Sequence, residues 1–329
     1  MNIAQNQLLP ITTRAGYAGK HIYEILTDRL LALQSMLGSY GFTSPIHRIR
    51  IHLEILKRLR EGYGIQSDEV LWSLVEATEL TDIWCAMPRM SARTMSEKFN
   101  AILNGPTHPQ QETAASGLAR NTVFELSLAS WLCHKGIPAY MGHNPDISCE
   151  VSDRRVFIQC KRPFSRQKVT DNVKRACKQL SRDLDFAGDP RNRGVVAISL
   201  NHAVNPGVAF MEVRNEADLV PAMASQIGPV AEHTVAAMVR GPRIVGAVFS
   251  FIAAAYIQAL NEYRTGRLLT LHISENASGA DKTLLRRVFL PTGNDARRSA
   301  AGTALNSNSS STRVDFAGQT SPDRLPYGG

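Results

Sequence analysis

The sequence lacks the cysteine and leader patterns of a secreted protein. No C-x-x-C pair occurs, and the five cysteines are irregularly scattered: Cys85, Cys133, Cys149, Cys160 and Cys177. An odd, irregular set of this kind is typical of reduced thiols, so we expect a cytoplasmic protein. The first twenty residues contain no basic segment followed by an apolar core, and we therefore expect no secretory signal. Four residues are candidate zinc ligands: Cys133, His134, His143 and Cys149. They lack the paired ligand spacing that is typical of zinc sites.

The sequence also has no apolar run of the about 20 residues that a membrane-spanning helix needs. Residues 244–261 carry no charge, but they include Gly246, Ser250 and Gln258 and begin with the β-favouring run IVGAVFSFI. We expect a buried strand followed by a second element, and no membrane partner.

Positive charge is concentrated in one part of the chain. The 329 residues carry 37 Lys and Arg against 29 Asp and Glu, a net charge of +8. Ten basic residues and a single acid, Asp171, lie between Arg154 and Arg182, which gives that segment a net charge of +9. The rest of the chain is close to neutral. This distribution favours a polyanionic partner that binds beside residues 154–182.

Local patterns divide the chain into four parts. Residues 1–104 form a helical N-terminal region with apolar residues at helical spacing, and Ser91 is a candidate cap for its last helix. Residues 105–117 read as a linker, and strands alternate with helices over 118–290. Residues 291–329 are small and polar, which predicts a disordered tail. Strands are expected at 145–151, 156–161, 194–200, 243–252 and 267–273.

Residues 144–163, NPDISCEVSDRRVFIQCKRP, predict a hairpin with two different faces. If residues 152–155 form the turn, Val151 pairs with Val156. One face is then apolar: Ile147, Cys149, Ile158 and Cys160. On the other face Asp146 lies opposite Lys161, and Ser148 lies opposite Gln159. Opposed side chains have Cβ atoms about 5 Å apart, so the polar residues are expected to form a cluster.

Pro145-Asp146 followed by Gln159-Cys160-Lys161 on an adjacent strand resembles the PD-(D/E)xK nuclease superfamily. Residues 157–162, FIQCKR, look like the Mrr-type restriction endonucleases, in which Gln replaces the second acid. The resemblance covers residues 118 to about 200. It implies a restriction-endonuclease-like α/β fold, a mixed sheet flanked by helices, and a Mg²⁺- or Mn²⁺-dependent endonuclease activity.

These families place a Glu on the preceding helix, and Glu125 is the only charge between Val123 and Cys133. A carboxylate on so apolar a helix needs a partner if it is buried. Alternatively, Glu125 lies at the helix edge in water. The resemblance implies that the catalytic residues are Glu125, Asp146, Gln159 and Lys161.

A hard cation takes oxygen ligands, and those expected here are Asp146, Gln159, the Cys160 backbone carbonyl and Glu125. Lys161 would orient or help deprotonate the attacking water. Gln159 removes one negative charge relative to the acidic form, which should weaken metal binding. Glu150 lies on the same expected face, where it either compensates or is a surface residue opposite Phe157.

A basic amphipathic helix is expected to begin near Asp171. Its apolar stripe is Val173, Ala176, Cys177, Leu180 and Leu184. Its other side is either a solvated face or a surface that follows a phosphate backbone. The residues expected to contact nucleic acid are Arg162, Lys174, Arg175, Lys178 and Arg182.

Three functions stay open from the sequence. The first is a metal-dependent DNA endonuclease of restriction or defence type, with duplex cleavage implying a homodimer or two successive nicks. The second is a nuclease-like fold that only binds nucleic acid, with the neutral Gln159 marking lost catalysis. The third is a scaffold protein that binds a protein partner through residues 1–104.

Overall fold

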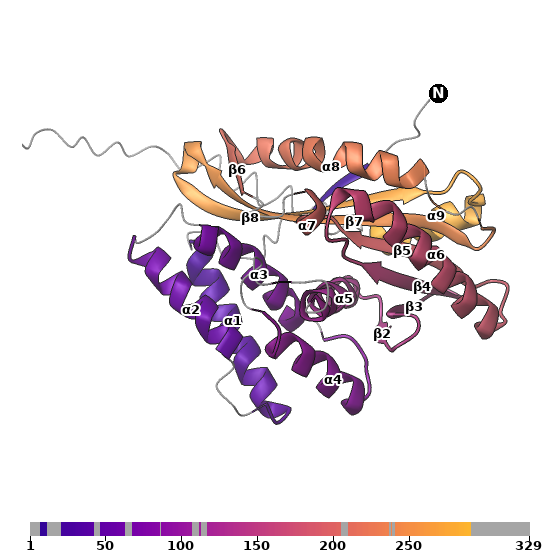
Figure 1. Ribbon diagram of the computed structural model, residues 1–329, viewed down its shortest axis with the longest axis horizontal. Coiled ribbons are helices and arrows are strands. Elements are labelled where there is room, and N and C mark those ends of the chain that lie inside the picture. The colour runs from indigo at the N-terminus through magenta and orange to yellow at the C-terminus, as the bar shows by residue number, and fades with distance from the viewer. Residues whose placement is uncertain are drawn as a thin grey trace, which may run out of the picture. The chain divides into compact units, whose positions relative to one another are not determined.

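Strands of a mixed sheet run through the middle of the protein, with helices on both faces (Figure 1). The structure, a computed structural model, describes residues 7–11, 21–42, 47–62, 68–85, 87–106, 112, 117–204, 210–236, 238 and 241–290. The expected tail at 291–329 lies outside the described residues.

In the described part of the chain the sheet has eight strands, in the order β1-β8-β7-β5-β4-β3-β2, and β6 pairs with β7 beyond this path. The central strands β4, β5 and β7 are parallel, whereas β1, β2, β3 and β8 run antiparallel to their neighbours. The bounds are β1 Gln7–Ile11, β2 Ala139–Met141, β3 Ile147–Val151, β4 Arg154–Lys161, β5 Arg193–Ser199, β6 Phe210–Val213, β7 Ile244–Ile257 and β8 Glu262–Ile273. The expected α/β class with a mixed sheet is confirmed.

The uncharged run at 244–261 is a strand that continues into a 3-10 turn, as the sequence predicted. β7 extends over Ile244–Ile257 and η3 over Gln258–Leu260. Both faces of β7 are covered, and Phe249 and Phe251 are fully buried; burying each side chain contributes about 1.5–3 kcal/mol. Among the described residues, no helix is long and apolar enough to cross a membrane.

Two hydrophobic clusters hold the helices against opposite faces of the sheet. The first includes residues of α1 Ile22–Ser39, α2 His47–Arg60, α3 Asp68–Cys85, α4 Ala92–Leu103, α5 Leu118–His134 and α9 Gly279–Phe289. The second includes residues of α6 Arg166–Ala187, α7 Asn201–Val204 and α8 Leu219–Ala236. Alternate residues of the strands enter one cluster or the other, as the period of two requires.

The helices before residue 105 share the first cluster with the sheet, and α3 and α4 both pack on α5. Ser91 caps α4 as predicted, since its hydroxyl accepts a hydrogen bond from the Thr94 backbone N–H at 3.1 Å. The chain leaves α4 at Gly105, where its backbone passes close to Ala119 of α5. A Cβ on Gly105 would lie 2.1 Å from the Cβ of Ala119, so only glycine permits this close approach.

Candidate functional site

The hairpin has the two faces that the sequence predicted, but its register differs by two residues. Ile147 pairs with Ile158, and Val151 pairs with Arg154. The turn is therefore Ser152-Asp153 rather than residues 152–155, and Ser152 adopts a left-handed backbone with φ 61°. A shift of two residues leaves every side chain on its original face, so the apolar face is unchanged.

The register brings Asp146 to Gln159 rather than to Lys161. Oδ2 of Asp146 accepts one hydrogen bond from Gln159 Nε2 at 2.6 Å and a second from the Cys160 backbone N–H at 2.8 Å. The prediction that Asp146 lies directly opposite Lys161 is wrong, as is the pairing of Ser148 with Gln159, because Ser148 pairs with Phe157. Asp146 is thus fixed against β4 at the end of the sheet ladder.

Glu125 lies on α5 beside this hairpin and is held by a lysine of another helix. Lys98 of α4 donates a hydrogen bond to Glu125 Oε2 at 2.6 Å, and the two side chains are only 14% and 15% exposed. Burial and the charge of Asp146 raise the pKa of Glu125, whereas Lys98 and Lys161 lower it. The carboxylate is therefore partly buried and paired, which excludes the simple reading of a solvated helix-edge residue.

Lys161 is half-buried at the end of β4, where its charge acts on both carboxylates. Burial raises the pKa of Asp146, and Lys161 is the strongest of the groups that lower it, followed by the Cys160 N–H, Lys98 and Gln159. Two carboxylates and two ammonium groups thus lie close enough to influence one another. They come from α4, α5, the segment before β3, and β4.

The oxygen of Gln159 makes the donor set suitable for a hard cation. Gln159 is 2% exposed, and its Oε1 atom is buried without a hydrogen-bond partner among the described residues. Such an orphaned acceptor is costly unless a ligand or water satisfies it. Mg²⁺ is usually held by one or two carboxylates and retains several waters. Asp146, Gln159 and Glu125 fit that description, although in the described part of the chain no three His, Cys, Asp or Glu side chains form a metal-binding group, zinc included.

Asp183 is a third carboxylate near the site and was not among the predicted site residues. It lies on α6, and burial together with the charge of Asp146 raises its pKa. Its Oδ2 atom is buried and has no partner within the described residues. Asp183 also borders an open groove of about 1060 Å³ between the hairpin and the end of α6. In the sequence Asp183 is one of three aspartates of a basic helix, with Asp171 and Asp185, and nothing distinguishes it from the other two.

Four of the five residues expected to contact nucleic acid form an exposed basic face on α6: Lys174, Arg175, Lys178 and Arg182. The helix starts at Arg166, five residues earlier than predicted, and buries the expected stripe of Val173, Ala176, Cys177, Leu180 and Leu184. Glu150 pairs with the exposed Arg155 at 2.8 Å instead of facing Phe157. It therefore lies on the surface of the hairpin.

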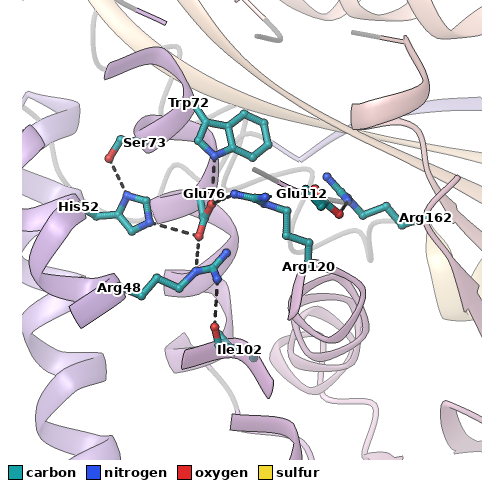
Figure 2. A network of polar contacts seen from close by, with 9 residues as sticks. All are labelled: Arg48, His52, Trp72, Ser73, Glu76, Ile102, Glu112, Arg120 and Arg162. Carbon is teal, nitrogen blue, oxygen red and sulfur yellow. Dashed lines mark hydrogen bonds and ion pairs between the residues drawn. The ribbon is translucent and has the colours of Figure 1, made fainter. Parts of the chain in front are cut away.

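Arg162, the fifth, is buried and takes part in a different network (Figure 2). Its guanidinium donates to Glu112, which lies in the 105–117 segment, and Glu112 also accepts from Arg120 at 3.1 Å. Arg120 also donates a hydrogen bond from Nη2 to Glu76 Oε2 at 2.8 Å. Arg162 is thus an internal ion-pair partner rather than part of the basic face, and the 105–117 segment contains a buried carboxylate.

Glu76 of α3 is the centre of that network (Figure 2). Its carboxylate accepts from Arg48, from Arg120, from Trp72 Nε1 at 3.1 Å, and lies 3.2 Å from His52 Nε2. Burial raises the pKa of Glu76, but Arg48, Arg120 and His52 together hold it well below its usual range. The network joins α2, α3, α5 and the end of β4, one residue beyond Lys161.

No protein-family model, no curated protein and no solved structure matches this chain. The resemblance to PD-(D/E)xK nucleases therefore depends on the motif residues and on their placement.

Proposed function

We propose that this protein is a metal-dependent endonuclease with a restriction-endonuclease-like core and that it hydrolyses phosphodiester bonds of DNA. The observation that carries the proposal is the meeting of Glu125, Asp146, Gln159 and Lys161 at one end of the hairpin. These are the residue types that the motif requires, and three separate elements bring them together. An exposed basic face on α6 lies next to the strands that carry them.

Each residue has a role in the proposed mechanism. A divalent cation, when bound, supplies charge for the phosphate and acidifies a water. Asp146, Gln159 Oε1, the Cys160 carbonyl and Glu125 would hold it. Lys161 orients the attacking water and stabilises charge that develops on the phosphate oxygens. The basic face of α6 neutralises backbone phosphates and so places the scissile bond at the site.

The same proposal places the protein in the cytoplasm, where its thiols stay reduced. No disulfide joins the four cysteines whose side chains are described: Cys133, Cys149, Cys160 and Cys177. Cleavage of both strands by one such site would require a homodimer or two successive nicks.

A second candidate is a nuclease-like fold that binds nucleic acid without cutting it. One observation favours it: Asp146 Oδ2 already accepts two hydrogen bonds, and Lys98 already neutralises Glu125. A site that is balanced in this way needs no cation to be stable. Salt-sensitive DNA binding without metal-dependent cleavage would select this candidate.

The deciding experiment measures nicking of supercoiled plasmid against Mg²⁺ or Mn²⁺ concentration, with a chelator control and DNA binding measured in parallel. Asp146→Asn keeps the size of the side chain but removes its charge, so we expect a loss of about 10² to 10⁴ in rate with binding retained. Asp153→Asn is the matched control, because Asp153 is an exposed acid in the turn of the same hairpin. Full activity in Asp146→Asn would exclude the proposed mechanism.

The DNA-binding measurement tests the role of the exposed basic face of α6. Charge reversal of Lys174, Arg175, Lys178 and Arg182 should weaken DNA binding and flatten its salt dependence, whose slope is about −0.9 per phosphate neutralised. Unchanged affinity and slope in the quadruple variant would show that DNA binds elsewhere.

A further inference from the structure

Lys98 connects the N-terminal helices to the candidate site. It lies on α4, whose inward face is formed by Thr94, Phe99 and Ile102, and its Nζ is 2.6 Å from Glu125 Oε2. Neither side chain is fully buried, since 14% and 15% of their surfaces remain exposed. The next ion pair on α4, between Arg93 and Glu97, is exposed, and the other partner of Glu97 is the exposed His143 at 3.4 Å. Lys98 therefore differs from its neighbours in having a partner on α5.

The formal charges of the four groups around the hairpin end sum to zero without any metal, and Asp183 on α6 adds one further negative charge nearby. Glu125 and Asp146 supply two negative charges, and Lys98 and Lys161 supply two positive ones. Two unit charges 4 Å apart interact by about 4 kcal/mol at an effective dielectric constant of 20, and a divalent ion doubles that value. A divalent cation bound to Glu125 would therefore repel an ammonium that remained on the same carboxylate.

We propose that Lys98 is the resident counter-ion of Glu125 and that a divalent cation displaces it on binding. The inference rests on the proposed function, because it concerns the same metal site. The flexible four-carbon stem of lysine allows the ammonium to leave while α4 stays in place. Metal binding then converts Lys98 from a partly buried ion-pair partner into an unpaired cation at the rim of the site, and α4 becomes part of the nuclease.

The wild-type protein itself provides the first test. The full chain is acetylated briefly with acetic anhydride, with and without saturating Mn²⁺, and each lysine is quantified by mass spectrometry. We expect Mn²⁺ to increase the labelling of Lys98 several-fold while that of Lys174 and Lys178, exposed on α6, stays constant. If Mn²⁺ binds in an Asp146-dependent manner but leaves the labelling of Lys98 unchanged or reduced, the inference is wrong and the metal site survives.

Calorimetric titration of variants with Mn²⁺ provides the second test. Lys98→Met removes the competing charge and should lower the dissociation constant about tenfold, whereas Lys98→Arg keeps a cation and should stay close to wild type. Arg93→Met is the matched control, since it removes an exposed cation from the same helix. Equal or weaker binding by folded Lys98→Met overturns the inference. If Lys98→Met does not fold, the acetylation experiment by itself tests the inference. Absence of Mn²⁺ binding in every protein, wild type included, would instead overturn the proposed metal site and this inference with it.

Discussion

Two clusters of charge meet at the end of β4, and they differ in how completely their oxygen acceptors are paired. The side chains of Glu76, Glu112 and the arginines paired with them are 0–4% exposed, and every carboxylate oxygen of the two glutamates has a partner. In this first cluster a buried atom without a hydrogen-bond partner among the described residues is a donor, Arg48 Nη2. The candidate site is less complete: Gln159 Oε1 and Asp183 Oδ2 have no partner among the described residues, and Lys98 and Glu125 remain partly exposed.

The contrast separates residues that hold the fold from residues that are available to a ligand. A buried carboxylate with several cationic partners costs free energy when any partner is removed, so it contributes to stability and specificity. An orphaned acceptor next to charged groups is a cost to the folded state, and such costs are typical of functional sites. Lys161, the last residue of β4, and Arg162, the next residue of the chain, belong to the two different kinds of cluster.

The largest effect on stability is expected from Glu76→Ala. The substitution leaves Arg48, Arg120 and His52 buried without their shared anion, and breaking such an arrangement costs about 3 to 5 kcal/mol. Urea denaturation measures the loss in the free energy of unfolding. Glu97→Ala is the control, because Glu97 pairs on the surface and should change stability by no more than about 0.5 kcal/mol. Similar losses in both variants would contradict the comparison.

Arg162→Met and Lys161→Met form a matched pair. The first removes a buried partner of Glu112, which keeps Arg120, so we expect a loss of about 3 kcal/mol of stability with nicking per folded molecule retained. The second should reduce nicking by about 10² to 10⁴ and change the free energy of unfolding by less than about 1 kcal/mol. Exchanged outcomes, with Arg162 required for cleavage and Lys161 for folding, would show that the two clusters have been assigned the wrong way round.

Glu79, three residues after Glu76 on α3, should make stability depend on pH. Burial raises its pKa from 4.5 to about 7, against the opposing charges of Arg267 and Arg162. Between these two values unfolding releases a proton, so rising pH favours the unfolded state by about 3 kcal/mol in total. Glu79→Gln should therefore be more stable than wild type at pH 8 and equal to it at pH 4. Denaturation curves at both values check this, and an equal difference at each pH would exclude titration of Glu79 as its cause.

The smallest effect is expected at the cap of α4, the helix that carries Lys98. Ser91→Ala removes the acceptor for the Thr94 N–H and should cost about 1 kcal/mol. Thermal denaturation measures the change, and Ser91→Asn, which can also cap, should retain most of the stability. If alanine and asparagine are equivalent here, the capping bond contributes nothing to the anchoring of Lys98.

The local pattern of apolar and polar residues was sufficient to predict the helices and strands that carry the site residues. The alternation in residues 147–160 gave the hairpin and its two faces, and the uncharged run at 244–261 gave the long central strand. The apolar stripe around Glu125 placed it on a helix, and the periodicity after Arg166 gave the buried side of α6. These inferences succeed because side-chain direction repeats with a period of 2.0 in strands and 3.6 in helices.

The hairpin register could not be obtained from local pattern, because a slip of two residues keeps both faces intact. It is decided at the turn, where Ser152 takes a left-handed backbone and Arg154 enters the ladder opposite Val151. Arg154 also donates to Asp281 of α9 at 2.9 Å, a partner 127 residues away. Residues this far apart give no shared signal in one sequence.

The sequence by itself determined which side chains face the core and which residues can supply charge. Only the tertiary structure decided which charges meet. Arg162 lies in the most basic segment of the chain and looks like part of a nucleic-acid surface, yet its partner is Glu112, fifty residues earlier. Lys98 is an ordinary helix residue until α4 packs on α5 and brings it to Glu125. Periodicity is a local property of the backbone, whereas an ion pair depends on the packing of elements that are distant in the chain.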